Sequence, residues 1–199
     1  MKKIFLMLAL AVVAVTANAE ELVGRYMVAG QEMDVEADFN SDGDLVVYFD
    51  VFGEYDGEKV MIGIRGEANI NAFIEGLQNC RAKYMQWVEI AAQHSVKNYS
   101  KFMDFSFPNI RVWWKNSSGD WCCSKENDIV NPKFVVDEDG ATCLTISGLE
   151  KDVDNEYIEQ QWCLSLVYAE DFDSLIEALN PTKLKTALDS TAALDALFQ

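Results

Sequence analysis

The sequence predicts an α+β fold, an antiparallel sheet with helices on one of its faces. Two observations carry this prediction. Short segments in which apolar and polar residues alternate are separated by Asp-Gly turns, which is typical of β-hairpins with one buried face. Each group of such segments is followed by apolar residues at the i, i+3, i+4, i+7 spacing of an amphipathic helix. Strands joined by hairpins favour antiparallel pairing, with the helices covering the apolar face.

The first group of strands leads into a long helix. A segment at 22–28 precedes two alternating segments, 35–39 and 45–51, which an Asn-Ser-Asp-Gly turn joins. A third segment at 60–64 follows another Asp-Gly turn, and the helix occupies about residues 70–91. The apolar stripe of this helix consists of Ile70, Phe73, Ile74, Leu77, Tyr84, Val88 and Ala91.

The second group repeats this order. Its expected strands lie at 110–114, 121–123, 134–136, 142–146 and 162–168. A helix capped by Asp171 or Asp173 follows, and the Asn-Pro pair at 180–181 interrupts it. At an offset of 102 residues, Val60, Ile62 and Ile64 align with Trp162, Leu164 and Leu166. We therefore predict two fused copies of a β-meander-plus-helix unit, residues 20–104 and 105–199, packed as one globular body.

The N-terminus has the features of a secretory signal peptide. Lys2 and Lys3 precede an unbroken apolar run at 4–15, and small residues at 16–19 match a signal-peptidase site. The apolar run is too short to span a bilayer, which requires about 20 residues. We expect cleavage after Ala19 and export to a periplasm or the extracellular space.

The composition restricts the class of partner. The chain carries a formal charge of −17, which becomes −19 without Lys2 and Lys3. Such a surface repels nucleic acids and anionic membranes, and it is compatible with cationic proteins, metal ions or neutral glycans. Half of the residues are hydrophobic, which argues against disorder.

Export makes disulfides possible for the five cysteines. A turn centred near Val153 places Cys143 opposite Cys163 on the sheet face away from the helices, so we predict a disulfide between them. The pairing of Cys80, Cys122 and Cys123 stays open.

The sequence contains no recognised catalytic motif and none for a cofactor. The single histidine, His94, lies about 21 Å along the predicted helix from Cys80, which excludes that pair as a nucleophile and base. A hydrolase that uses acidic residues remains an alternative, because carboxylates are abundant. The segment from Asp38 through Asn40 to Asp42 resembles the start of a calcium loop, but Phe49 stands where the closing glutamate is needed. It is a weak calcium candidate, and a plain hairpin turn explains the same residues.

The tryptophans suggest a binding surface. Trp113 and Trp114 are adjacent on one predicted strand, so their side chains point to opposite faces of the sheet. One of them, with Trp121 on the returning strand, would form an aromatic surface suited to a sugar ring or a protein partner. We therefore expect an exported, non-enzymatic binding module for a protein or a glycan. The alternatives are the hydrolase and an inhibitor or immunity-type protein that covers a cationic partner.

Overall fold

The computed structural model describes residues 21–55, 57–130 and 132–195. The predicted signal peptide, residues 1–19, lies outside them. The described chain confirms the α+β prediction, with one antiparallel sheet and three helices. Within this part of the chain, no helix is both long and apolar enough to cross a membrane.

The sheet contains eleven strands in the order β5-β9-β10-β11-β3-β4-β6-β7, with β1 paired to β2, β2 to β3, and β8 to β6. The strands are β1 (Glu21–Val28), β2 (Gln31–Phe39), β3 (Leu45–Gly53), β4 (Val60–Arg65), β5 (Tyr99–Phe102), β6 (Ser106–Lys115), β7 (Trp121–Cys123), β8 (Asn127–Val130), β9 (Lys133–Val136), β10 (Thr142–Lys151) and β11 (Glu159–Leu166).

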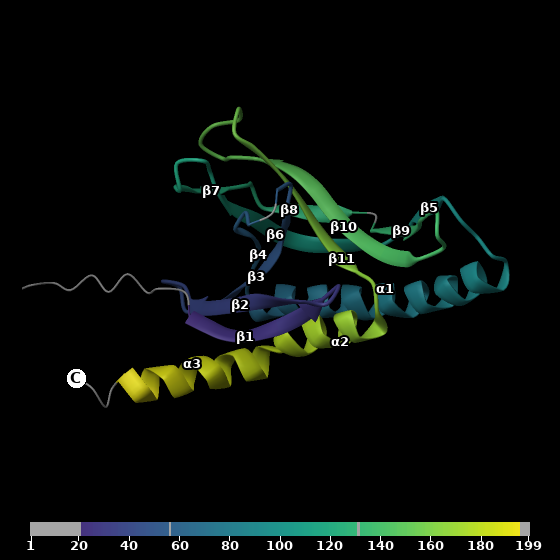
Figure 1. Cartoon of the computed structure of the whole chain (residues 1–199). Helices are drawn as coiled ribbons and strands as arrows, with labels where there is room; N and C mark the ends of the chain where they lie inside the picture. Colours follow the sequence, from purple (N-terminus) through teal and green to yellow (C-terminus); the bar gives the residue numbers. More distant parts are fainter. Residues whose placement is uncertain (1–20, 56, 131, 196–199) are drawn as a thin grey trace, which may run out of the picture.

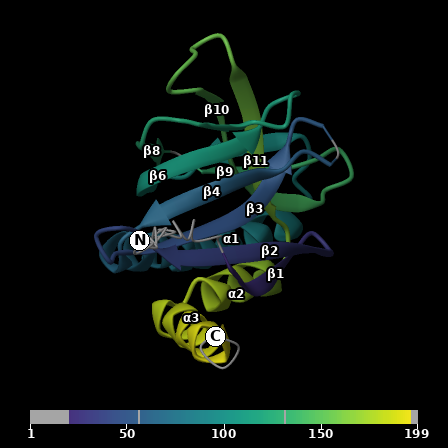
Figure 2. The ribbon, with the colours of Figure 1, turned by 90° about the vertical axis from the view of Figure 1, so that its left-hand side faces the viewer.

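The helices pack against the apolar face of this sheet and against its first hairpin. Helix α1 (Glu67–Gln93) runs behind β3, while α2 (Ala169–Ala178) and α3 (Pro181–Asp195) lie along β1 (Figures 1 and 2). The Asn-Pro break predicted in the second helix is confirmed as the junction between α2 and α3.

The core lies between α1 and the sheet. The ring of Phe73 on α1 packs between Phe49 on β3 and Phe107 on β6, with centroid distances of 5.6 and 4.8 Å. Further along α1, the ring of Tyr84 packs against Phe134 and Phe172, at 5.8 and 5.4 Å. Full burial of one such side chain contributes about 1.5–3 kcal/mol, so α1 is held mainly by this face.

The alternate strand positions that the predicted duplication aligns are confirmed as buried. Val60, Ile62 and Ile64 on β4 are buried, and so are their aligned partners Trp162, Leu164 and Leu166 on β11. The leading strands, however, pair differently, because β1 pairs with β2 whereas β6 pairs with β4, β7 and β8. The duplication itself therefore stays a prediction.

The register predicted for the β10–β11 hairpin is wrong. Residue Ser147, not Cys143, lies opposite Cys163, because the connecting turn is centred nearer Asn155 than Val153. Both cysteines do lie on the face away from the helices, but the shift of four residues separates them along the strands. In the structure all five cysteines are free thiols, so the geometry that predicted a Cys143–Cys163 disulfide is absent.

Candidate functional site

The face of the sheet turned away from α1 is not covered by a helix. Its side chains alternate with the buried ones along β3, β4 and β6, because successive residues of a strand point to opposite faces. We call this surface the open face. Its central residues are Val46 and Tyr48 on β3, Gly63 and Arg65 on β4, and Arg111 and Trp113 on β6.

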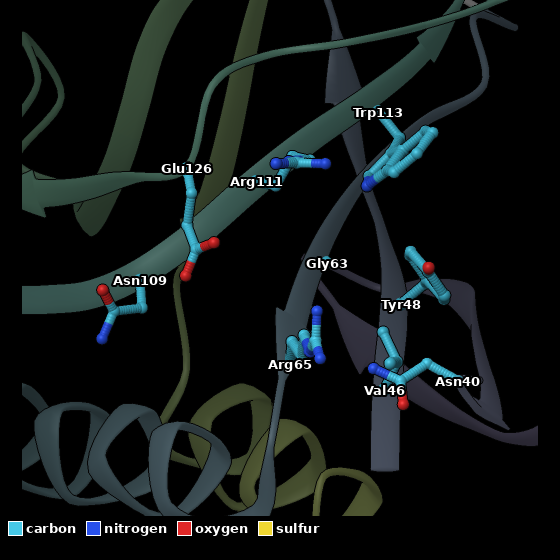
Figure 3. A pocket seen from close by; sticks show the side chains of 9 residues that line it. All are labelled: Asn40, Val46, Tyr48, Gly63, Arg65, Asn109, Arg111, Trp113 and Glu126. Carbon is cyan, nitrogen blue, oxygen red and sulfur yellow. The ribbon is translucent and has the colours of Figure 1, made fainter. Parts of the chain in front are cut away.

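A pocket of about 210 Å³ lies on the open face. The strands β3, β4 and β6 form its floor, and residues from the turn after β2 and the segment after β7 form its rim (Figure 3). It is lined by Asn40, Val46, Tyr48, Gly63, Arg65, Asn109, Arg111, Trp113 and Glu126.

Two aromatic rings form one wall of the pocket. The rings of Tyr48 and Trp113 meet edge to face, with centroids 6.1 Å apart and planes at 82°. Gly63 lies between their strands, directly opposite Tyr48 on β3. A Cβ atom at Gly63 would stand 3.0 Å from the Tyr48 ring and 3.1 Å from Nε1 of Trp113. The absence of a side chain at Gly63 therefore lets both rings close over β4.

The two arginines of the pocket differ in their partners. Arg65 binds the carboxylates of Asp42 and Asp44, at 2.6 and 2.9 Å. The Arg111 guanidinium lies 5.9 Å from the centre of the Trp113 ring, and no carboxylate of the described chain is within ion-pair distance of it. Arg111 thus places a positive charge without an acidic partner beside an aromatic wall, in a protein whose net charge is strongly negative.

The predicted aromatic residues divide between the two faces as expected from strand geometry. Trp114 is 1% exposed and belongs to the core, whereas Trp113 lies on the open face. Trp121, which is 46% exposed, pairs with Lys115 on β6 and so shares the face of Trp113. It lies outside the pocket, with the Lys115 ammonium 5.1 Å from its ring centre.

The weak calcium candidates lie at the end of β2 and in the turn between β2 and β3, where protein groups bind their oxygens. Oδ1 of Asn40 accepts the backbone N–H groups of Asp42 and Asp44, at 3.0 and 2.9 Å. Asp42 pairs with Arg65, and Asp38 accepts a backbone N–H from its neighbour. In the described ranges, no three His, Cys, Asp or Glu side chains are grouped so that they could hold a metal ion.

A second group of charges on the sheet is neutralised internally. Lys59 Nζ binds Glu36 at 3.1 Å and Asp50 at 2.6 Å. Burial raises the pKa of Asp50, although the Lys59 ammonium opposes this shift.

Of the pocket residues only Glu126 is a carboxylate, and His94 lies at the far end of α1 as its C-cap. The pocket therefore lacks the carboxylate pair of a glycosidase site.

The sequence reasoning missed Tyr48, Gly63 and Arg111. The alternation along the strands indicated that these side chains share one face. Tyr48 lies between two core positions, and Arg111 is two residues before Trp113 on the same strand. What the sequence did not provide was the strand order that brings β3, β4 and β6 together.

No family model, curated protein or solved structure matches the chain.

Proposed function

We propose that the protein is an exported, non-enzymatic binding module that recognises an acidic glycan in the pocket of the open face. The observation that carries the proposal is the placement of Arg111 beside Trp113. A guanidinium without an acidic partner and an indole ring stand together in the pocket. Sugars with a carboxylate present an apolar ring face and an anionic group that match these two side chains.

The pocket supplies each kind of contact that such a ligand requires. The faces of Trp113 and Tyr48 provide apolar area for the C–H groups of a sugar ring, as aromatic side chains in binding sites do. Arg111 can hold a carboxylate with two parallel hydrogen bonds, the strongest of the common charged geometries. Asn40 and Asn109 add amide groups at the rim.

A pocket of about 210 Å³ is small beside typical small-molecule sites. It accommodates one sugar unit, and further units would extend along the open face. Trp121 lies on this face beyond the pocket, where it would contact a neighbouring unit of a longer chain.

The hydrolase alternative is less well supported, because one carboxylate lines the pocket and glycosidases use two. The inhibitor or immunity-type alternative uses the total negative charge instead of the pocket. Association of a cationic partner with the total charge weakens steeply with salt, whereas one Arg111–carboxylate pair combined with stacking on Trp113 weakens much less. Titrations at low and high salt therefore distinguish the two modes of binding.

Calorimetric titration of the chain with a tetrasaccharide of galacturonic acid tests the proposal. We expect binding to the wild-type chain and binding at least about tenfold weaker to Trp113→Leu and to Arg111→Gln, since each removes about 1.4 kcal/mol or more. Lys151→Gln is the control, because it removes one positive charge in the β10–β11 hairpin, away from the pocket. Equal affinity of Arg111→Gln and wild type, or no binding to the wild type, would contradict the proposal.

A further inference from the structure

We propose a second site, independent of the pocket: the free edge of β5 and the groove beside it bind an extended, acidic segment of another protein. Strand β5 is the last strand on its side of the sheet order and pairs only with β9. Its outer edge therefore offers backbone groups that another strand can pair with. Figure 1 shows this edge beside the C-terminal part of α1, at the end of the molecule opposite α3.

Two aromatic side chains at this edge are exposed. Phe102 is 63% exposed and Tyr99 is 47% exposed. Between β5 and α1 lies a groove of about 300 Å³ lined mainly by Trp87, Ile90, Val96 and Phe134. Its size suits one aromatic or branched side chain of a strand added to β5, since alternate residues of an added strand point to the same side.

Lysines without acidic partners lie on both faces of this edge, Lys83 and Lys101 beside the groove and Lys133, which pairs with Phe102, on the opposite face. Lys83 and Lys101 place their ammonium groups 5.3 and 4.9 Å from the centre of the Trp87 ring, and Lys133 lies 5.8 Å from that of Phe102. None of these lysines has a carboxylate within 4.0 Å in the part of the chain that the structure describes. Elsewhere Arg25, Lys59, Arg65 and Arg81 are paired with Asp or Glu.

The charges determine which occupant fits. A second copy of β5 would bring a second Lys101 to this edge and no carboxylate to pair with it, so the charges favour an acidic strand over self-pairing. The acidic turn Asp137–Asp139 lies at the Tyr99 end, where Asn98 donates its backbone N–H to the Asp137 carbonyl at 2.9 Å. An acidic strand with apolar residues at alternate positions therefore binds with an apolar side chain in the Trp87 groove, next to Lys101, and with its carboxylates on the opposite face, toward Lys133.

Lysines on a free edge also occur as a protection against aggregation. That role requires neither an apolar groove beside the edge nor an exposed Phe102. Binding experiments separate the two roles, because a protected edge takes up no acidic strand.

The probe is a fluorescein-labelled octapeptide in which aspartate alternates with leucine, followed by fluorescence anisotropy. We expect the wild-type chain to bind it and the double variant Lys101→Glu, Lys133→Glu to bind about tenfold or more weakly. The double variant Lys151→Glu, Lys183→Glu is the matched control, since it changes the net charge equally elsewhere and keeps the affinity. Amide resonances of Tyr99–Phe102 shift on titration if the peptide adds to β5.

Three results would overturn this inference. They are no binding at millimolar chain concentration, equal loss of affinity in both double variants, and binding without shifts in the β5 amides. Trp113→Leu should bind the octapeptide like the wild type, so failure at this edge and failure of the pocket are separate outcomes.

Discussion

At the scale of single residues, one side-chain arrangement recurs in the hairpin turns. The side chains of Asn40, Asn116 and Asp137 each accept the backbone N–H groups of the residues two and four positions later. A glycine with positive φ completes each turn, as Gly43 does at +82° after Asn40. Asn and Asp favour such local hydrogen bonds, which explains why the sequence of the first turn resembles the start of a calcium loop.

The turn between β6 and β7 provides a test of this arrangement. Asn116→Ala removes hydrogen bonds to Ser118 and Asp120, of 2.9 and 3.0 Å, and should lower the free energy of unfolding by about 1–2 kcal/mol. Denaturant unfolding measures the change. The neighbouring variant Ser117→Ala should stay within about 0.5 kcal/mol of the wild type. Equal effects of both variants would show that the Asn116 side chain does not stabilise the turn.

At the scale of elements, the helices and the Asp-Gly turns were well predicted, whereas the β10–β11 turn and the long-range pairing were not. The predicted helix at 70–91 is α1, Glu67–Gln93, because one apolar stripe determines where it packs. The β10–β11 register failed because four of the five residues from Asp152 to Glu156 are polar, so composition did not locate the centre of the loop. The order of strands depends on contacts distant in sequence, and local patterns contain no information on it.

Helix α1 contains a glycine whose replacement tests the packing of the core. Alanine normally favours a helix over glycine by about 1 kcal/mol. At Gly76, however, a Cβ atom would stand 2.7 Å from Cε1 of Phe107, which is fully buried. We therefore expect Gly76→Ala to destabilise the protein by about 1–3 kcal/mol, a decrease in Tm of several degrees.

Asn79→Ala, at an exposed position of the same helix, is the matched control for this effect. It should stabilise slightly, because alanine is the better helix former. Differential scanning calorimetry of both variants compares the two effects. A higher Tm for Gly76→Ala would show that Phe107 can move aside and that the α1–β6 contact is looser than described.

At the scale of the whole molecule, the strand order determines the site. Trp113 could be predicted from the sequence, because adjacent tryptophans on a strand must diverge. Tyr48 is 65 residues earlier in the chain than Trp113 and reaches it through β4, which pairs with both β3 and β6. The helices lie on the other side of the sheet and leave this wall open. The pocket is therefore a property of the assembled sheet and of no single segment.

The central claim is that an acidic glycan binds against Trp113. The chain has five tryptophans, so an ¹H–¹⁵N spectrum of the labelled protein contains five indole N–H resonances. The signal that Trp113→Phe removes identifies Trp113. During titration with the galacturonic acid tetrasaccharide, the account predicts a large shift of this resonance and none for the buried Trp114 and Trp162. An unchanged Trp113 signal, or a shift of Trp87 alone, would contradict it.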